Sequence, residues 1–341
     1  EDLYPLADGT MPFKYAPLTA PLFLPLTLPP AGVAVALWNV GSLGALVAVA
    51  RVLGRPGVLG STERRWPWAP VLTTLVLLPS FRFEFFYGQV DGVLLGLLTL
   101  AVLGAEKGRT WGPAAALAVA LLLKPPAGLL VLFFAVRRHW RVLAASVCVG
   151  LVLTLPALLR YGLEGLLEQS RAWLATLART TPPWALGPQP QGLPTQVLSW
   201  LVPPDTLPSS AALSLAQGLA LAFFLGALAW GRPGPRALFA LCCLGVTLLS
   251  PLAWRANFLM AWPALLLACE GRTRGGLLLV VLVAVAGVLC LDFVVGDAFA
   301  LQALFWRPYA LVFTALLLWI VHVKRGQARP PDAFAVPARA G

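Results

Sequence analysis

Apolar runs recur about every 20–30 residues along the chain, and several are long enough to cross the hydrocarbon layer of a bilayer, which is roughly 30 Å thick. Hydrophobic residues make up 59% of the sequence and charged residues only 11%. A soluble domain would carry about a quarter charged residues. The sequence therefore predicts an all-α, polytopic integral membrane protein.

The net charge of +11 is divided among short basic clusters that separate the apolar runs. This pattern indicates membrane topology and not a nucleic-acid surface, because cytoplasmic turns are rich in Lys and Arg. If the basic clusters lie on the cytoplasmic side, the apolar runs between them cross the membrane alternately, and about the first 30 residues lie on the extracytoplasmic side. This arrangement predicts spans at about residues 32–53, 67–81, 89–105, 142–159, 211–230, 236–249, 257–269, 276–295 and 304–323.

Residues 111–136 do not fit a simple crossing, because basic clusters stand at both ends and each half is short. Lys124, Pro125 and Pro126 separate the halves, and proline interrupts a helix. We expect a broken helical hairpin that lifts Lys124 toward the outer half of the membrane. Irregular backbone at that depth is tolerated only where protein buries it or where it lines a wet cavity, so this segment predicts a cavity.

The longest predicted outer loop, residues 160–210, begins with "RYGLEGLLEQSRAWLATLAR", whose Leu and Trp residues repeat at helical spacing. We expect this stretch to lie flat on the outer surface. The following "TTPPWALGPQPQGLP" predicts an irregular loop because it is rich in Pro and Gly. We expect one transmembrane domain over residues 1–323 and a cytoplasmic, disordered tail over residues 324–341. The chain begins at Glu1 and not at Met, and we expect that an amino-terminal piece precedes it.

Ionisable and polar residues near membrane depth suggest function by default, because they are costly there. Four outer-side groups qualify: Asp8, Lys14 and Tyr15; Arg82, Glu84, Tyr87, Gln89 and Asp91; Lys124; and Trp254, Arg255 and Asn257. Each has a structural alternative. The basic residues can anchor the chain at lipid headgroups, Glu84 can neutralise Arg82, and the aromatic residues can belong to an interfacial belt.

A phosphate-bearing lipid matches this set of side chains. Lys and Arg bind phosphate, a carboxylate accepts a proton from an attacking hydroxyl, and aromatic faces stack on sugar rings. The sequence contains no glycine loop for phosphate, no nucleophile elbow and no cysteine or histidine spacing typical of zinc, so we expect no metal and no cofactor.

Five segments in order carry a resemblance to a known family: "FKYAPL", "YGQVDGVLLGLL", "LLLKPPAGLLVL", "GLPTQVLSWL" and "LLSPLAWRANFLMAWP". Together they resemble the glycosyltransferase 87 family, the branch related to polyprenyl-phosphate-mannose-dependent alpha-mannosyltransferases. The resemblance implies a GT-C-like helical bundle with short broken helices and outer-side loops. It also implies an inverting hexosyltransferase in the cytoplasmic membrane that transfers a hexose, mannose above all, from a polyprenyl-phosphate sugar to a lipid or glycan acceptor on the outer face.

Carried onto this sequence, the resemblance gives site roles as follows: Asp91, Glu84 and Asp8 are candidate bases, Lys124, Arg255 and Arg82 bind the donor phosphate, and Tyr15, Gln89, Trp254 and Asn257 line the sugar or acceptor site. The chain departs from the family pattern in three places. The family's catalytic aspartate is expected upstream of "EDLYP". The Gly-Gln-Val element usually continues with Asn, where this chain has Asp91. The Ser-Pro-Trp element often carries His nearby, where this chain has Asn257.

Two other functions fit the same features. Broken helices at depth also hold the substrate in transporters and lipid flippases. An inactive, truncated relative that acts as an assembly partner is the other alternative. Membrane lipids are expected partners in every case, and nucleic acid in none.

Overall fold

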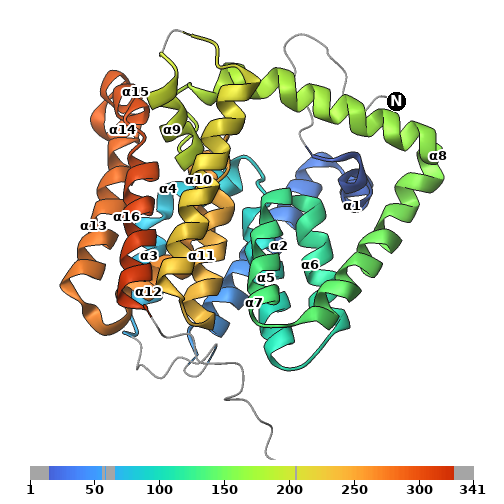
Figure 1. The fold of residues 1–341 in the computed structure, drawn as a ribbon, viewed down its shortest axis with the longest axis horizontal. Coiled ribbons are helices and arrows are strands. Elements are labelled where there is room, and N and C mark those ends of the chain that lie inside the picture. Colours follow the sequence, from blue (N-terminus) through green and yellow to red (C-terminus); the bar gives the residue numbers. More distant parts are fainter. Residues whose placement is uncertain (1–14, 56–57, 59–65, 204–205, 326–341) are drawn as a thin grey trace, which may run out of the picture.

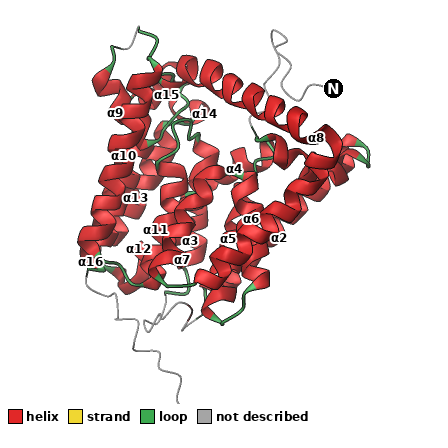
Figure 2. Cartoon of the chain, turned by 45° about the vertical axis from the view of Figure 1, so that its right-hand side comes forward, coloured by secondary structure: helices red, strands yellow, loops and turns green. Residues whose placement is uncertain are grey.

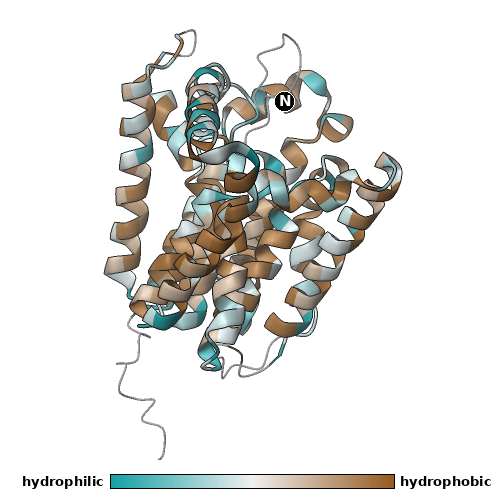
Figure 3. Ribbon diagram, turned by 90° about the vertical axis from the view of Figure 1, so that its right-hand side faces the viewer, coloured by the Kyte–Doolittle hydropathy of each residue, from teal (hydrophilic) through white to brown (hydrophobic). Residues whose placement is uncertain are grey.

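The computed structural model describes residues 15–55, 58, 66–203 and 206–325, and these residues form α-helices and 3-10 helices without a strand (Figure 2). Apolar residues dominate the middle of the bundle, whereas hydrophilic residues gather toward its two ends (Figure 3). The predicted all-α, polytopic membrane fold is confirmed. Asp8, Lys14 and the tail beyond residue 325 lie outside the described residues.

Among the described residues, three helices are long and apolar enough to cross a membrane by themselves: α2 (Ala31–Leu53), α8 (Trp140–Ala185) and α10 (Ser210–Gly231). Two bent pairs raise the number to five. They are α3 (Ala69–Val76) with α4 (Leu78–Phe86), bent by 63°, and α15 (Asp297–Phe305) with α16 (Pro308–Val323), bent by 47°. The other predicted spans coincide with shorter helices, so the count of nine crossings stays a prediction.

The centre of the bundle is a pair of segments that are apolar and buried on almost every side. These are α11 (Pro235–Leu248) and the 3-10 helix η5 (Arg255–Ala261), which runs directly into α12 (Trp262–Cys269). A helix that is apolar all round belongs in a protein core. The helices packed around this pair include α3, α7 (Leu129–Val136), α13 (Arg274–Leu289) and α16.

A second group of helices lies beside this core: α2, α5 (Asp91–Glu106), α6 (Trp111–Leu123) and the first arm of α8 (Figure 1). They pack in the order α2, α5, α6, α8, each against the next. α5 also contacts η5, which joins the two groups near their outer ends. The candidate site lies at this junction.

The predicted break at Lys124 is confirmed. α6 ends at Leu123, Lys124 has an extended backbone (φ −148°, ψ 98°), and the 3-10 helix η4 (Pro125–Gly128) leads into α7. Residues that precede proline are driven out of the helical conformation by the proline ring, which explains the position of the break. Both α6 and α7 pack against α8, but α6 also packs against α5 whereas α7 packs against α11, so the two halves of the segment have different further neighbours.

The helix α8 has two arms that meet at Gly162, whose left-handed backbone (φ 68°) permits the sharp bend. The second arm crosses the top of the molecule in Figure 1 and contains the predicted amphipathic stretch. The prediction of an irregular loop from residue 180 is wrong at its start, because the helix continues through Pro182 and Pro183 to Ala185. The rings of Pro182 and Pro183 remove two backbone donors from this part of the helix, and Arg307 donates to the carbonyl of Leu186, just beyond the helix end, at 3.2 Å.

Short helical elements complete the outer end. η1 (Pro17–Thr19), α1 (Ala20–Phe23) and η2 (Leu24–Thr27) occupy part of the predicted membrane-hugging segment. α9 (Leu193–Leu201) lies within the predicted outer loop, residues 160–210. α14 (Asp292–Val295) precedes α15, which covers most of residues 296–303 between the last two predicted spans. On the opposite side, η6 (Glu270–Arg272) connects α12 to α13.

Residues just before α9 and in its first turn form hydrogen bonds with the turn that leads into η5. Gln191 donates its backbone N–H to the carbonyl of Ala253 at 2.7 Å, and Thr195 donates its hydroxyl to the carbonyl of Pro251 at 2.8 Å. Gly192 lies between them, and a Cβ atom at this position would come within 2.2 Å of the carbonyl oxygen of Ser250. Only glycine therefore allows the two segments to approach this closely.

We expect Gly192→Ala to lower the free energy of unfolding by about 1–3 kcal/mol, the usual range for an overpacked contact, because backbone must move to admit the methyl group. Gly218→Ala in α10 is the matched control, since nothing lies within 4 Å of a Cβ atom there. Thermal unfolding in detergent micelles compares the two variants. Equal melting temperatures for both would contradict the close approach at Gly192.

Candidate functional site

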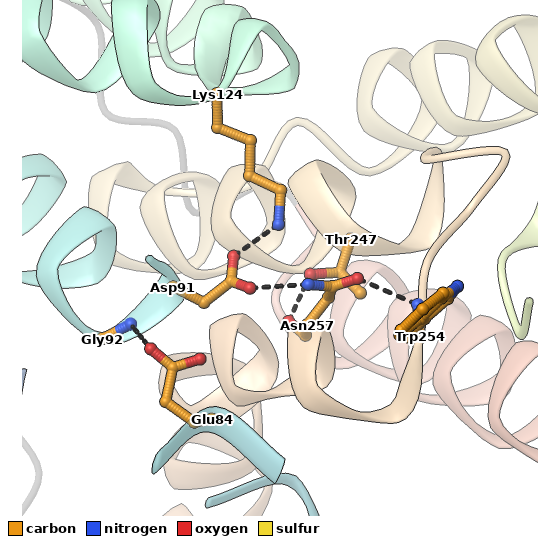
Figure 4. A network of polar contacts seen from close by, with 7 residues as sticks. All are labelled: Glu84, Asp91, Gly92, Lys124, Thr247, Trp254 and Asn257. Atoms are coloured by element: carbon orange, nitrogen blue, oxygen red, sulfur yellow. Dashed lines mark hydrogen bonds and ion pairs between the residues drawn. The ribbon is translucent and has the colours of Figure 1, made fainter. Parts of the chain in front are cut away.

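A buried carboxylate, Asp91, joins three parts of the bundle (Figure 4). Lys124 donates from Nζ to its Oδ1 at 2.6 Å, and Asn257 donates from Nδ2 to its Oδ2 at 2.6 Å. The Asp91 side chain is 0% exposed and that of Lys124 is 18% exposed. Both carboxylate oxygens are therefore engaged in short polar contacts away from water.

Local structure places each member of this network. Asp91 is the first residue of α5, where the positive end of the helix dipole favours a carboxylate. Lys124 occupies the break between α6 and η4. Asn257 lies on η5, where its Oδ1 accepts the backbone N–H of Trp254 at 2.9 Å and its carbonyl accepts the Thr247 hydroxyl at 2.6 Å. Because the amide oxygen is occupied, the amide NH₂ group is the part that faces Asp91.

A second carboxylate, Glu84, lies beside this network on α4 and is 1% exposed. Its Oε1 accepts the backbone N–H of Gly92 at 2.7 Å (Figure 4). Its Oε2 has no hydrogen-bond partner among the described residues. A Cβ atom at Gly92 would lie 3.2 Å from Oε1, so the glycine lets α4 come close to the start of α5. Glu84 therefore keeps one oxygen with spare capacity to accept a proton or a donor.

Tyr15 belongs to the same neighbourhood. Burial, together with the negative charges of Asp91 and Glu84, raises the pKa of its phenol to about 12. Its ring packs against Phe23 with centroids 5.7 Å apart. Near neutral pH this phenol keeps its proton, so it can donate a hydrogen bond to an oxygen in the site.

Gln89 is held between Trp38 and Glu84 by its backbone. Trp38 donates from Nε1 to the Gln89 carbonyl at 3.1 Å, and the Gln89 N–H donates to the Glu84 carbonyl at 2.9 Å. These bonds fix the turn between α4 and α5, in which Gly88 adopts a left-handed conformation (φ 58°). The turn aligns Glu84 with the first residues of α5.

Two arginines from different segments share a separate pocket of about 270 Å³. Arg82 and Arg255 line it together with Asp292 and Leu291, and with the aromatic residues Phe83, Phe86 and Tyr87. The Arg255 guanidinium lies 4.4 Å from the centroid of the Phe83 ring and donates to the carbonyl of Cys290. Lys124 does not line this pocket, although the resemblance grouped it with the two arginines on one phosphate.

The sequence profile of glycosyltransferase family 87 matches residues 13–253, which is most of the chain. The chain belongs to glycosyltransferase family 87. It is 37% identical over 147 residues to a protein of Mycolicibacterium smegmatis (strain ATCC 700084 / mc(2)155) named polyprenol-phosphate-mannose-dependent alpha-(1-2)-phosphatidylinositol pentamannoside mannosyltransferase. It is 33% identical over 90 residues to a protein of the same name from Mycobacterium tuberculosis (strain CDC 1551 / Oshkosh).

The alignments are partial. The first covers 42% of this chain and 33% of the relative, and the second covers 26% of this chain and 20% of the relative. No solved structure matches the chain. The predicted family is confirmed, whereas the GT-C-like arrangement of the bundle stays a prediction.

The family 87 match contains most of the residues expected from sequence, and the fold brings them into two sets. Tyr15, Glu84, Gln89, Asp91, Lys124 and Asn257 lie around the buried network, while Arg82 and Arg255 line the outer pocket. The matched region ends at residue 253, just before Trp254 and Arg255, so η5 is contributed by the part of the chain beyond it. Within the described residues, no cluster of His, Cys, Asp and Glu could hold a metal ion.

Sequence reasoning missed Asp292, which lines the arginine pocket. It follows directly after the long apolar run that forms α13, so an ionisable residue at the outer end of a predicted span was the available signal. The predicted span was extended to residue 295, so the end of α13 at Leu289, and the ionisable residue just after it, were not recognised.

We expect Asp91→Asn to destabilise this family 87 protein by roughly 3 kcal/mol, because it leaves the Lys124 ammonium largely buried without a counter-ion. The double variant Asp91→Asn with Lys124→Met removes both charges, and we expect it to recover more than half of that loss. Thermal unfolding in nanodiscs measures the coupling as a double-mutant cycle. Glu164→Gln on the exposed second arm of α8 serves as the control. Additive losses for the two single variants would show that the pair does not act as a unit.

Proposed function

We propose that this chain carries out hexosyl transfer in a membrane, taking mannose from a polyprenyl-phosphate sugar and adding it to a lipid or glycan acceptor. Membership of family 87 over residues 13–253 carries the proposal. The names of both relatives specify a polyprenol-phosphate-mannose donor and a phosphatidylinositol mannoside acceptor, and we extend the donor and a lipid-linked acceptor to this chain. The site would face the outer side of the cytoplasmic membrane, away from the basic turns.

The reaction proposed is a single inverting displacement. The acceptor hydroxyl oxygen attacks the anomeric carbon, the bond from that carbon to the phosphate oxygen breaks, and polyprenyl phosphate leaves with the bonding electron pair. A carboxylate takes the hydroxyl proton as the new bond forms. Cationic side chains stabilise the charge that develops on the leaving phosphate.

Among the three candidate bases, Glu84 has the arrangement that suits proton transfer best. Its Oε2 is free of hydrogen-bond partners among the described residues, whereas both oxygens of Asp91 are engaged. Asp91 could act as the base only after exchanging one of these bonds for one to the acceptor. We therefore assign Asp91 to positioning Lys124 and Asn257. Asp8, the third candidate, lies outside the described residues.

The remaining residues divide between the two ends of the donor headgroup. Arg82 and Arg255 would hold the phosphate through their guanidinium forks, and Lys124, with one N–H on Asp91 and two others, would add charge on the sugar side. Tyr15, Gln89, Trp254 and Asn257 would surround the sugar or the acceptor. The protonated Tyr15 phenol would supply a donor to a sugar oxygen.

We expect Glu84→Gln to lower transfer by about 10²–10⁴-fold, the usual contribution of a general base, because the amide cannot take the hydroxyl proton. The substitution keeps the side-chain length and the oxygen that accepts the Gly92 N–H, so the melting temperature should stay close to that of the unchanged protein. The assay follows radiolabelled mannose from polyprenyl-phosphate-mannose into phosphatidylinositol mannosides and other membrane lipids in proteoliposomes.

Glu164→Gln is again the control, and it should transfer at the normal rate. Normal transfer by Glu84→Gln would remove Glu84 from the reaction. Absence of transfer by the unchanged chain to every lipid in the extract, with the donor intact, would overturn the proposed function.

A further inference from the structure

An apolar groove of about 510 Å³ opens between α3 and α13 on the outside of the bundle. Its walls are entirely aliphatic and include Leu72 and Val76 from α3 and Ala284 and Val285 from α13. On α13 the lining runs from Leu277 to Leu289, a length of about 18 Å at the helical rise per residue, which is more than half the hydrocarbon thickness. Such a groove suits an extended hydrocarbon chain that lies along the bilayer normal.

The same two segments lead from this groove to the arginine pocket. On one wall, α13 ends at Leu289, which lines the groove, and Leu291 and Asp292 line the pocket directly after it. On the other wall, α3 continues into α4, which supplies Arg82, Phe83, Phe86 and Tyr87 to the pocket. The apolar groove and the cationic pocket therefore follow one another along the same pair of elements.

The charges at the pocket match a phosphodiester. Two arginines and one aspartate leave a formal charge of +1, and a sugar phosphodiester carries one negative charge. Neither Arg82 nor Arg255 forms an ion pair with another described residue. Arg82 instead lies 5.4 Å from the centroid of the Phe293 ring, and Arg255 lies against Phe83. Aromatic faces hold a guanidinium in place while leaving hydrogen-bond donors on its edge for phosphate oxygens.

The pocket also lies next to the buried network. Arg255 and Asn257 are two residues apart on η5, about 4 Å along the axis of a 3-10 helix. α4 carries Arg82 on the pocket side and Glu84 at the network. A sugar attached to a phosphate on the two arginines would therefore lie at about the depth of Glu84 and Asn257, which project from other faces of the same two elements.

We propose that the α3–α13 groove holds the polyprenyl chain of the donor, with its phosphate on Arg82 and Arg255, so that the donor enters sideways from the outer half of the bilayer. This inference rests on the proposed function and names how its lipid substrate is bound. A polyprenyl phosphate is the occupant that satisfies both parts of the site, since it combines a long aliphatic chain with a single anionic group at one end.

The test measures binding without sugar transfer. The full chain in phosphatidylcholine nanodiscs is labelled with a photoreactive long-chain polyprenyl phosphate, and unlabelled polyprenyl phosphate, farnesyl phosphate and phosphatidic acid compete. Val285→Trp places a large ring in the groove at a position that is 46% exposed, so the core need not move. Leu278→Trp is the matched control on the same helix, because Leu278 is 58% exposed and does not line the groove.

We expect Val285→Trp to weaken long-chain binding by at least about tenfold, equivalent to displacing two CH₂ groups from an apolar site. Farnesyl phosphate binding should weaken as well, because Val285 lies about 6 Å from Leu289 along α13, within reach of a farnesyl chain. Arg255→Gln should weaken both ligands by about tenfold or more, and Leu278→Trp should weaken neither. Cross-linked peptides should come from α3 and α13. Ala284→Phe, on the half-buried floor of the groove, provides a second variant that should repeat the Val285→Trp result.

Normal long-chain binding by both groove variants would overturn the inference. So would equal competition by phosphatidic acid, because it would make the groove a site for ordinary membrane lipid. The proposed function fails separately. Binding that depends on the groove without mannose transfer by the unchanged chain would contradict the function alone, whereas transfer that is indifferent to Val285→Trp would contradict the groove alone.

Discussion

The contact between Lys124 and Asp91 is the constraint on which the outer half of the bundle depends. A buried ion pair repays its loss of hydration only when further hydrogen bonds satisfy the charged groups. Here Asn257 binds the second carboxylate oxygen, and the first turn of α5 favours the negative charge. The start of α5, the break after α6 and the 3-10 helix η5 must therefore meet at one depth. The network fixes where these three segments meet, and so fixes the site as well as the fold.

Much of the fold could be predicted from sequence because its signals are local. Apolar runs bounded by basic residues gave the helices, and Lys124-Pro125-Pro126 gave the break in residues 111–136. Partners across the fold could not be predicted the same way. The contact between Asp91 and Lys124, 33 residues away, was not predicted, and the role of Asp91 as a base stays a prediction. Glu84 was considered a neutralising partner for Arg82, yet it binds Gly92. Such contacts depend on how the helices pack against one another, and the sequence of one segment does not reveal which residue of another segment it will meet. The helix through Pro182 and Pro183 was missed because adjacent prolines signal a loop, whereas the contact at the end of α8 comes from Arg307, which is distant in sequence.

The site separates two kinds of charge. The inner network is enclosed, and in it the charge of Lys124 is matched by Asp91, with the carboxyl group of Glu84 beside them. The outer pocket is open to solvent or lipid headgroups and carries the excess of arginine. Charged groups are better tolerated where water can reach them, and a phosphate is attracted there first. η5 and α4 each contribute a residue to both parts, so movement of either would shift the cationic pocket and the network together. Strong packing between α4 and η5 opposes such movement.

The sequence departs from the expected family pattern just after the Gly-Gln-Val element and near the Ser-Pro-Trp element. The two residues at these departures contact each other. The expected pattern has Asn at the position of Asp91 and often His near the position of Asn257. In this structure, Nδ2 of Asn257 donates to Oδ2 of Asp91 at 2.6 Å. A carboxylate needs donors, and an amide whose oxygen is already bound by the Trp254 N–H can only offer its NH₂ group. The carboxylate in turn supplies the negative charge that the largely buried Lys124 requires, which a neutral Asn at residue 91 would not. The carboxylate of Asp91 and the amide of Asn257 are therefore chemically matched at this contact, and together with Lys124 they form one unit in the polar core of the site.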